Sequence, residues 1–298
     1  MEKILICLVI ALYGVNAFSS DPNNRINNGA DALISNFPYM VSIQRIAEIN
    51  TTGRGHKCGG AMITLQHVLT AASCLFNPVD GNLVPINAQQ YRVFGGAASL
   101  TADNDQTRVR QIQNVTIYPD YIHPPASLHN IGIITLLTPF LNTTVSPIPL
   151  PIASFYPEDF TLCQIAGWGA QNSTTTASYA LQYTRKYIYN QALCTNLYSQ
   201  LAVHPNIFSS MVCAASYDIV SSGCQGDEGS PLVCSGGFTG ILVQTNGCTV
   251  SSFPEVYTRI SNYTTWIRTV TGGSSTIRPE LTFFAILAVI TFKILNRA

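Results

Sequence analysis

Residues 224–232 read Cys-Gln-Gly-Asp-Glu-Gly-Ser-Pro-Leu, so a glycine- and serine-rich turn directly precedes the short apolar run 232–234. Similar runs bounded by Gly, Pro, Asn or Ser recur at residues 40–44, 62–70, 91–94, 131–137 and 240–244. Regularly spaced short strands with turn signals predict an all-β sandwich or barrel. Only residues 263–270 have a helical pattern.

The composition bounds the class of protein. Of the 298 residues, 47% are hydrophobic and 10% are charged, which is typical of a chain that buries a large core and is not disordered. The 15 basic and 15 acidic residues give a net charge of zero. This balance argues against nucleic acid as a partner.

The N-terminus has the features of a secretory signal peptide at residues 1–17. Lys3 precedes an apolar run at residues 4–13, and Val15-Asn16-Ala17 is a small-x-small cleavage site. A buried N-terminal segment is the alternative. Cys7 would leave with the signal, and eight of the nine cysteines would remain for bridges in an oxidising compartment. Asn-x-Ser/Thr sequons predict surface glycans at Asn50, Asn114, Asn142, Asn172 and Asn262.

The C-terminal residues 271–298 form a separate segment. The small residues 271–275 and a short spacer precede a mostly apolar run at residues 281–292. This run is shorter than the roughly 20 residues that a membrane helix needs. The order matches a glycosylphosphatidylinositol (GPI) attachment signal, although Lys293 interrupts the tail. A short membrane helix and a plain hydrophobic tail are the alternatives.

Seven sequence blocks resemble the trypsin/chymotrypsin-like serine protease family, in the order that the family has them. They are Arg25-Ile26-Asn27-Asn28-Gly29, Cys58-Gly59-Gly60, Leu69-Thr70-Ala71-Ala72-Ser73-Cys74, Asn130-Ile131-Gly132-Ile133, Ala166-Gly167-Trp168-Gly169, residues 224–232, and Pro254-Glu255-Val256-Tyr257-Thr258-Arg259. One block would be weak support, but seven in order are specific. The resemblance covers residues 26–270.

The resemblance implies a fold and a disulfide pattern. The fold would be two six-stranded antiparallel β-barrels, at about residues 26–150 and 151–262, with a C-terminal helix at about 263–270. Eight cysteines allow 105 pairings by sequence alone. The family pattern implies the bridges Cys58–Cys74, Cys163–Cys234, Cys194–Cys213 and Cys224–Cys248.

All three positions of the family's catalytic triad carry other residues. Ser73 stands where the family has His, Asn130 where it has Asp, and Glu228 where it has the nucleophilic Ser. A hydroxyl cannot act as general base near pH 7, and a neutral amide cannot stabilise an imidazolium. We therefore expect no peptide hydrolysis, and call the chain a catalytically inactive serine protease homologue.

Other chemistry has little support in the sequence. None of the histidines is expected to replace the missing base: His56, His67, His123, His129 and His204. Asp227 and Glu228 are adjacent acids, but glycosidase carboxylates must face each other across a bond. No His or Cys pair has metal-ligand spacing, so we expect neither a metal nor another cofactor.

The activation machinery of the family is partly kept. Arg25-Ile26 resembles its activation cleavage site, which makes residues 18–25 a short propeptide. The resemblance implies that the freed Ile26 amine pairs with Asp227. A retained conformational switch and inheritance without use are both open.

The specificity pocket implied by the family is altered. Its base would be Ser222, and the side chains of Thr245 and Glu255 would narrow it where the family has glycine. Residues 243–245, the docking strand, read Val-Gln-Thr where the family has Ser-Trp-Gly. The alternative is an acidic pocket around Glu255 that accepts a basic group.

The Glu228 side chain has several possible placements. The resemblance implies an oxyanion hole formed by the N–H groups of Gly226 and Glu228. The carboxylate could fold back onto them, or point across the vacated His space. The Asn130 side chain and the Ser73 hydroxyl could then hydrogen-bond it, so we expect the three replaced positions to form one polar cluster. A solvent-facing side chain is the alternative.

The sequence predicts an extracellular, GPI-anchored, non-catalytic binding or regulatory protein. Its partner would be an unknown protein or glycan, with active proteases or cascade components as candidates. An active endopeptidase of the same family and an antimicrobial or glycan-binding surface protein are the alternatives.

Overall fold

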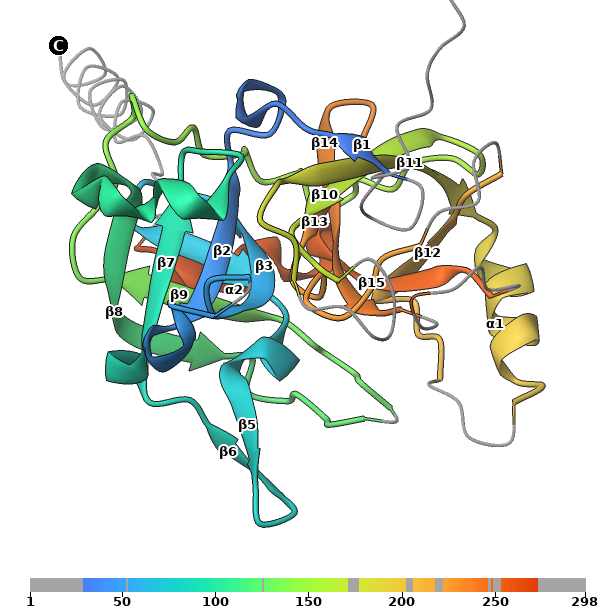
Figure 1. Ribbon diagram of the computed structural model, residues 1–298. Coiled ribbons are helices and arrows are strands. Elements are labelled where there is room, and N and C mark those ends of the chain that lie inside the picture. Colours follow the sequence, from blue (N-terminus) through green and yellow to red (C-terminus); the bar gives the residue numbers. More distant parts are fainter. Residues whose placement is uncertain are drawn as a thin grey trace, which may run out of the picture.

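The computed structural model describes residues 29–272, except residues 52, 125, 171–176, 202–205, 218–221, 246–247 and 249–252. The predicted signal peptide, propeptide, Arg25, Ile26 and Asn172, and the tail from residue 273 onward, lie outside the described residues. Figure 1 shows the described chain as two β-barrels side by side, with the first barrel built from the N-terminal half.

The first barrel closes in the strand order β2-β3-β4-β9-β8-β7, counted over the described residues. Its strands are β2 (Met40–Arg45), β3 (His56–Met62), β4 (His67–Thr70), β7 (Tyr91–Gly95), β8 (Val109–Ile117) and β9 (Gly132–Leu136). Neighbouring strands are antiparallel. The barrel interior is apolar, because β-branched side chains such as Val41, Val93 and Ile133 point inward and are fully buried.

The second barrel has the strand order β11-β10-β13-β14-β15-β12, and the pairing of β11 with β12 closes it. Its strands are β10 (Leu162–Gly167), β11 (Gln182–Tyr189), β12 (Met211–Ala215), β13 (Pro231–Cys234), β14 (Gly237–Gln244) and β15 (Glu255–Arg259). The two-residue strand β1 (Ala30–Asp31) adds to β11. The prediction of two six-stranded antiparallel barrels is therefore confirmed for the part of the chain that the structure describes.

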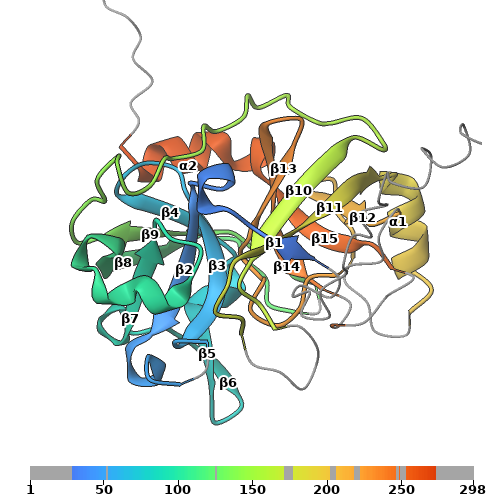
Figure 2. The ribbon, with the colours of Figure 1, turned by 45° about the horizontal axis from the view of Figure 1, so that its top comes forward.

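Short helices connect and flank the barrels. The 3-10 helices are η2 (Ile34–Asn36), η3 (Ile46–Glu48), η4 (Ala72–Leu75), η5 (Ala88–Gln90), η6 (Leu100–Asn104), η7 (Gln106–Arg108) and η8 (Ile260–Tyr263). The predicted C-terminal helix is α2 (Thr264–Val270), and Figure 2 shows it along the top of the first barrel. The helix α1 (Gln191–Tyr198) was not predicted from the sequence. Asn190 caps it by accepting a hydrogen bond from the Leu193 N–H at 3.0 Å.

One predicted strand is wrong. The run at residues 62–70 is divided, because β3 ends at Met62 and β4 begins at His67. The Thr64 hydroxyl accepts hydrogen bonds from the N–H groups of Gln66 and His67, and this local turn replaces the strand.

A hairpin of β5 (Phe76–Val79) and β6 (Asn82–Pro85) projects from the first barrel (Figure 1). Asp80 and Gly81 have positive φ angles of 49° and 80°, as a tight two-residue hairpin turn requires. The hairpin starts directly after η4, so it stands beside the candidate site.

All four predicted disulfides are present: Cys58–Cys74, Cys163–Cys234, Cys194–Cys213 and Cys224–Cys248. Cys58–Cys74 fixes η4 to β3, and Cys224–Cys248 ties the turn before Asp227 to the loop after β14. Both bridges therefore hold backbone on which the candidate site is built.

Candidate functional site

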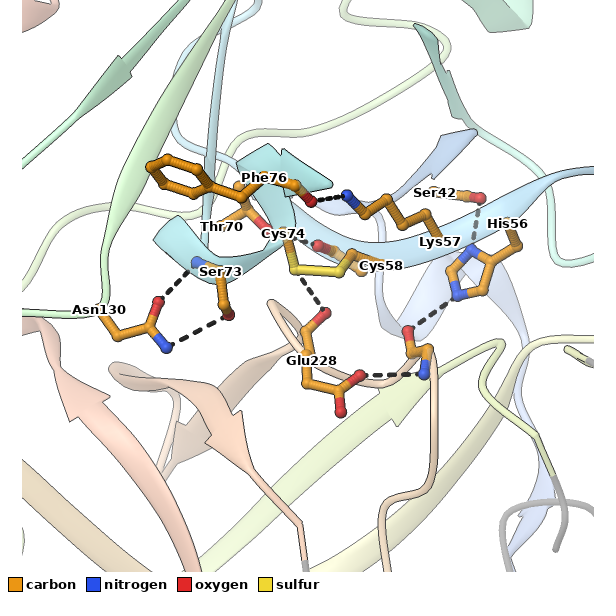
Figure 3. Close-up of a disulfide and its surroundings, with 12 residues drawn as sticks. Ser42, His56, Lys57, Cys58, Thr70, Ser73, Cys74, Phe76, Asn130 and Glu228 are labelled. Carbon is orange, nitrogen blue, oxygen red and sulfur yellow. Dashed lines mark hydrogen bonds between the residues drawn. A yellow bond between two sulfur atoms is a disulfide. The ribbon is translucent and has the colours of Figure 1, made fainter. Parts of the chain in front are cut away.

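The first barrel contributes Ser73 and Asn130, which bond to each other. Asn130 Oδ1 accepts a hydrogen bond from the Ser73 N–H at 2.9 Å, and Asn130 Nδ2 donates to Ser73 Oγ at 3.2 Å. Figure 3 shows this reciprocal pair beside the Cys58–Cys74 bridge. Asn130 is fully buried. Its neutral amide binds the N–H group in the first turn of η4 and supplies no charge to the site.

The second barrel contributes Glu228, on the turn before β13. Its carboxylate folds back, and Oε2 accepts a hydrogen bond from the Gly226 N–H at 2.9 Å (Figure 3). Burial raises the pKa of the Glu228 carboxyl, while the N–H groups of Glu228 and Gly226 act in the opposite direction. The carboxylate thus binds the Gly226 N–H, one of the two donors that the family resemblance makes an oxyanion hole.

The expectation of one polar cluster is wrong. Among the described residues, no hydrogen bond joins the Glu228 carboxylate to Ser73 or Asn130. The replaced positions form two separate groups, because the backbone donor at Gly226 satisfies the acid and the Asn130 amide is used at η4.

Asp227 points away from the open site and is buried. Its Oδ1 accepts from the Gly169 N–H and its Oδ2 from the Cys224 N–H, both at 2.9 Å. Burial is the main cause that raises its pKa to about 7, and the nearby Glu228 and Glu255 add to the rise. Asp227 and Glu228 therefore bind separate backbone groups, an arrangement that differs from the facing carboxylates of a glycosidase.

A close backbone approach holds Asp227 in place. A Cβ atom at Gly169 would lie 2.4 Å from the Asp227 carboxylate, so only glycine fits there. Asp227 is 2% exposed to solvent. Among the described residues, none forms a salt bridge with the Asp227 carboxyl.

The side chain of Glu255 turns inward at the position of the specificity pocket. Its Oε1 accepts from Lys186 Nζ at 3.0 Å and from the Gly223 N–H at 2.5 Å, and its Oε2 accepts from the Tyr257 hydroxyl at 2.5 Å. The Lys186 and Glu255 side chains are 2% and 4% exposed. The chain's own lysine has taken the place of a basic ligand, so the alternative of an acidic pocket for such a ligand is not supported.

Thr245 and Glu255 both approach Gly223 closely. A Cβ atom at Gly223 would lie 3.2 Å from the Thr245 methyl group and 3.4 Å from Glu255 Oε1. Ser222, the expected pocket base, is buried. Thr245 and Glu255 therefore lie against Gly223, next to the expected pocket base.

Two members of the site were not predicted from the sequence. Lys186 was not singled out, although alternation along β11 turns residues 182, 184, 186 and 188 toward the barrel interior. His56 was judged unimportant, yet its Nε2 lies 2.9 Å from the Gly226 oxygen and its Nδ1 lies 2.7 Å from Ser42 Oγ. Burial lowers the pKa of His56 to about 4, so the neutral ring supports the Gly226 backbone.

Two further described histidines bond to side chains away from the site. His129 Nδ1 lies 2.8 Å from the Tyr263 hydroxyl, and His67 Nδ1 lies 2.8 Å from Thr64 Oγ1. Neither ring reaches Ser73 or Glu228. Within the part of the chain that the structure describes, no group of three or more His, Cys, Asp or Glu side chains is arranged for a metal ion.

A cavity of about 480 Å³ opens beside Gly226. Arg45, Lys57, His56 and Gln225 are among the residues that line it. The charges are largely engaged: Arg45 pairs with Glu48 at 2.9 Å, and Lys57 Nζ donates to the Phe76 oxygen and to Asn77 Oδ1. Burial and the Arg45 charge lower the pKa of Lys57 to about 8.

Comparison with known proteins gives concordant results. The sequence model of the family described as Trypsin matches residues 26–267. Trypsin V-B of Rattus norvegicus is 30% identical over 266 residues, which cover 88% of this chain and 97% of the relative. The structure is similar to human heparin binding protein, with a TM-score of 0.66 and 27% identity over 83% of this chain and 97% of the other.

A further solved structure is neuropsin, a serine protease expressed in the limbic system of mouse brain. It has a TM-score of 0.65 and 28% identity, and the match covers 82% of this chain and 98% of the other. The family match spans both barrels and every described site position discussed above. The chain belongs to the trypsin family of serine proteases.

Proposed function

We propose that this trypsin-family protein is a non-catalytic homologue that acts by binding. The observation that carries the proposal is the Glu228 carboxylate on the Gly226 N–H. Acyl transfer needs that donor for the developing oxyanion. An internal carboxylate there fills the space of the substrate oxygen and repels its negative charge.

The remaining positions support the same reading. Ser73 has a hydroxyl where catalysis needs a base. Both polar groups of the Asn130 amide form hydrogen bonds with Ser73. The buried Lys186–Glu255 pair lies at the position where the family resemblance implies the specificity pocket. We therefore expect that restoring the triad alone would not restore docking of a substrate side chain.

The test uses protein cleaved at Arg25, a fluorophosphonate probe and trypsin, chymotrypsin and elastase peptide substrates. We expect neither labelling nor turnover above buffer. Stoichiometric labelling of any serine, or turnover that resists purification, would contradict the proposal.

Two variants separate the triad from the pocket. The reversion Ser73→His, Asn130→Asp and Glu228→Ser should restore labelling by the small probe, which needs no side-chain pocket. Peptide turnover should require the additional changes Lys186→Ala and Glu255→Gly. Turnover by the reversion alone would show that the pocket opens despite the ion pair.

We further infer an extracellular, GPI-anchored protein. Four disulfides favour an oxidising compartment, and Asn50, Asn114, Asn142 and Asn262 are exposed, as glycans require. None of the helices within the described residues has the length and apolar run that a membrane crossing needs. Phosphatidylinositol-specific phospholipase C should release the protein from cultured animal cells. Mature protein that ends at Ala298 by mass spectrometry would exclude the anchor.

A further inference from the structure

Four aromatic side chains, two of them exposed and two half-buried, form a patch on the outside of the second barrel. Tyr187 and Tyr189 lie two residues apart on β11 and point to the same face, and Phe160 and Tyr217 cover them. The Tyr217 ring centroid lies 5.7 Å from those of Phe160 and Tyr187, and 6.4 Å from that of Tyr189, with which it is stacked at 8°. We call these four residues the aromatic patch.

Folding alone does not account for the patch. Phe160 is 66% exposed and Tyr217 is 52% exposed, so much of their apolar surface stays in water. Phe160 also has a φ of +64°, a left-handed conformation that is costly for a bulky side chain. Its N–H donates to the Ile188 oxygen at 2.8 Å, which fixes the turn. Strain and exposure at one aromatic residue are typical of a site kept for a ligand.

The patch continues into a groove. Leu162 pairs with Tyr187 across β10 and β11, so their side chains lie on the same face. Leu162 also lines a cavity of about 540 Å³ between β10, β13 and the chain that links the barrels. Figure 2 shows β10 and β11 side by side on the outer surface of the second barrel. We call this cavity the groove.

The groove is uncharged and mixed in character. Pro147, Pro149 and Tyr39 supply apolar walls, while Asn36 and Gln164 supply amides. Among the described residues that line it, none is Asp, Glu, Lys, Arg or His. Its volume lies in the range of small-ligand sites. A charged ligand would gain no ion pair here, so the lining favours a neutral, polar ligand.

We propose that the aromatic patch and the groove bind a neutral oligosaccharide. A pyranose ring has a face of C–H groups that packs on an aromatic ring, and an edge of hydroxyls that both donate and accept hydrogen bonds. The amides of Asn36 and Gln164 likewise do both. At the edge of the patch, Asn190 Nδ2 donates to Asp159 Oδ2 at 2.7 Å, and this exposed polar pair suits sugar hydroxyls.

A proline-rich peptide is the strongest competing occupant, because such peptides also dock on aromatic grooves. Its proline residues have no N–H and offer only carbonyl acceptors. The amide oxygens of Asn36 and Gln164 would then lack donors from the ligand. The hydroxyls of an oligosaccharide can donate to the oxygen and accept from the NH2 group of each amide, which is why we favour an oligosaccharide.

The experiment screens the secreted full chain on an array of neutral tri- to hexasaccharides of glucose, mannose and N-acetylglucosamine. The hexasaccharide with the highest signal is then titrated by calorimetry against wild type, Phe160→Ala and Tyr217→Ala. We expect each variant to weaken binding at least about tenfold, because a central exposed ring carries much of such a contact. Tyr179→Ala is the matched control, since Tyr179 is an exposed tyrosine outside the patch, and should bind as wild type does.

Four results would overturn the proposal. They are no binding to any neutral glycan, equal binding by the patch variants, patch-dependent binding of a proline-rich peptide, and patch-dependent binding of a heparin hexasaccharide. Circular dichroism melts of the variants should match wild type, because both truncated rings are solvent-exposed. The proposed loss of catalysis concerns other residues, so either proposal can fail without the other.

Discussion

The two barrels differ in how they accommodate the replaced catalytic positions. On the first barrel, Ser73 and Asn130 are small neutral residues that satisfy each other within 3.2 Å. On the second barrel, Asp227, Glu228 and Glu255 place three acids close together, and each has separate partners. Compared with the residues that the family has at these positions, the first barrel carries neutral Asn130 in place of Asp. The second barrel carries Glu228 and Glu255 in place of the neutral Ser and Gly.

This difference shows what the scaffold must supply when chemistry is lost. Neutral replacements need only a local hydrogen bond, because their desolvation cost is modest. Buried acids need donors or a counter-charge, so the second barrel uses backbone N–H groups and brings Lys186 into its interior. Mutations should therefore cost much more stability on the second barrel than on the first.

The largest effect is expected for Lys186→Met. This change leaves Glu255 buried without its counter-charge, which typically costs about 3–5 kcal/mol of unfolding free energy. Chemical denaturation monitored by Trp fluorescence measures the loss. A cost below about 1 kcal/mol would show that the Glu255 carboxylate becomes solvated or protonated with little loss of unfolding free energy.

The matched control is the double variant Lys186→Met with Glu255→Gln. The glutamine oxygen can still accept from the Gly223 N–H, and no charge remains buried. We expect the double variant to recover most of the stability lost by the single one. Failure to recover would assign the loss to packing around the lysine stem.

A second effect concerns Asp227 and pH. Burial raises its pKa from 3.8 to about 7, so in that window the folded chain holds a proton that the unfolded chain releases. The stability of uncleaved protein should therefore fall as the pH rises from about 4 to about 7, by on the order of 3–4 kcal/mol from this group. Asp227→Asn should abolish this contribution.

His56 works against Asp227 in the same window. The pKa of His56 is 6.5 in the unfolded chain and about 4 in the folded chain. As the pH falls from 6.5 to 4, the unfolded chain therefore takes up a proton that the folded chain does not, and the stability of the folded chain decreases. The measurement is therefore the difference between wild type and Asp227→Asn in thermal melts at several pH values. Parallel curves would show that Asp227 does not titrate in this range.

Much of the fold could be predicted from the sequence. Short runs with turn signals indicated barrels, and the family resemblance supplied the four bridges that the structure contains. Helix α1 was missed because eight residues give little periodicity, although Asn190 followed by a helical turn is a capping signal. The break after Met62 was missed because Thr64 makes its turn with side-chain hydrogen bonds and not with glycine or proline.

The candidate site was less predictable. The positions Ser73, Asn130 and Glu228 could be located from neighbouring motifs, but their partners could not. Lys186 and Glu255 are 69 residues apart, and a single sequence does not reveal such a pair. The fold-back of Glu228 was one of several open placements, because only the backbone geometry at Gly226 decides where a flexible carboxylate goes.

The smallest effect is expected on the first barrel, for Ser73→Ala. The Asn130 Nδ2 group would lose one hydrogen-bond acceptor at 3.2 Å, but the stronger bond from the residue 73 N–H to Asn130 Oδ1 would remain. Ser73 is half-buried, so water can reach the freed amide, and the cost should stay below about 1 kcal/mol. Asn130→Ala removes both bonds and leaves the N–H at the start of η4 without its acceptor, which should cost about 1–3 kcal/mol. Urea unfolding of the two variants side by side measures the ratio. If Ser73→Ala were as costly as Lys186→Met, the contrast between the neutral and the charged barrel would fail.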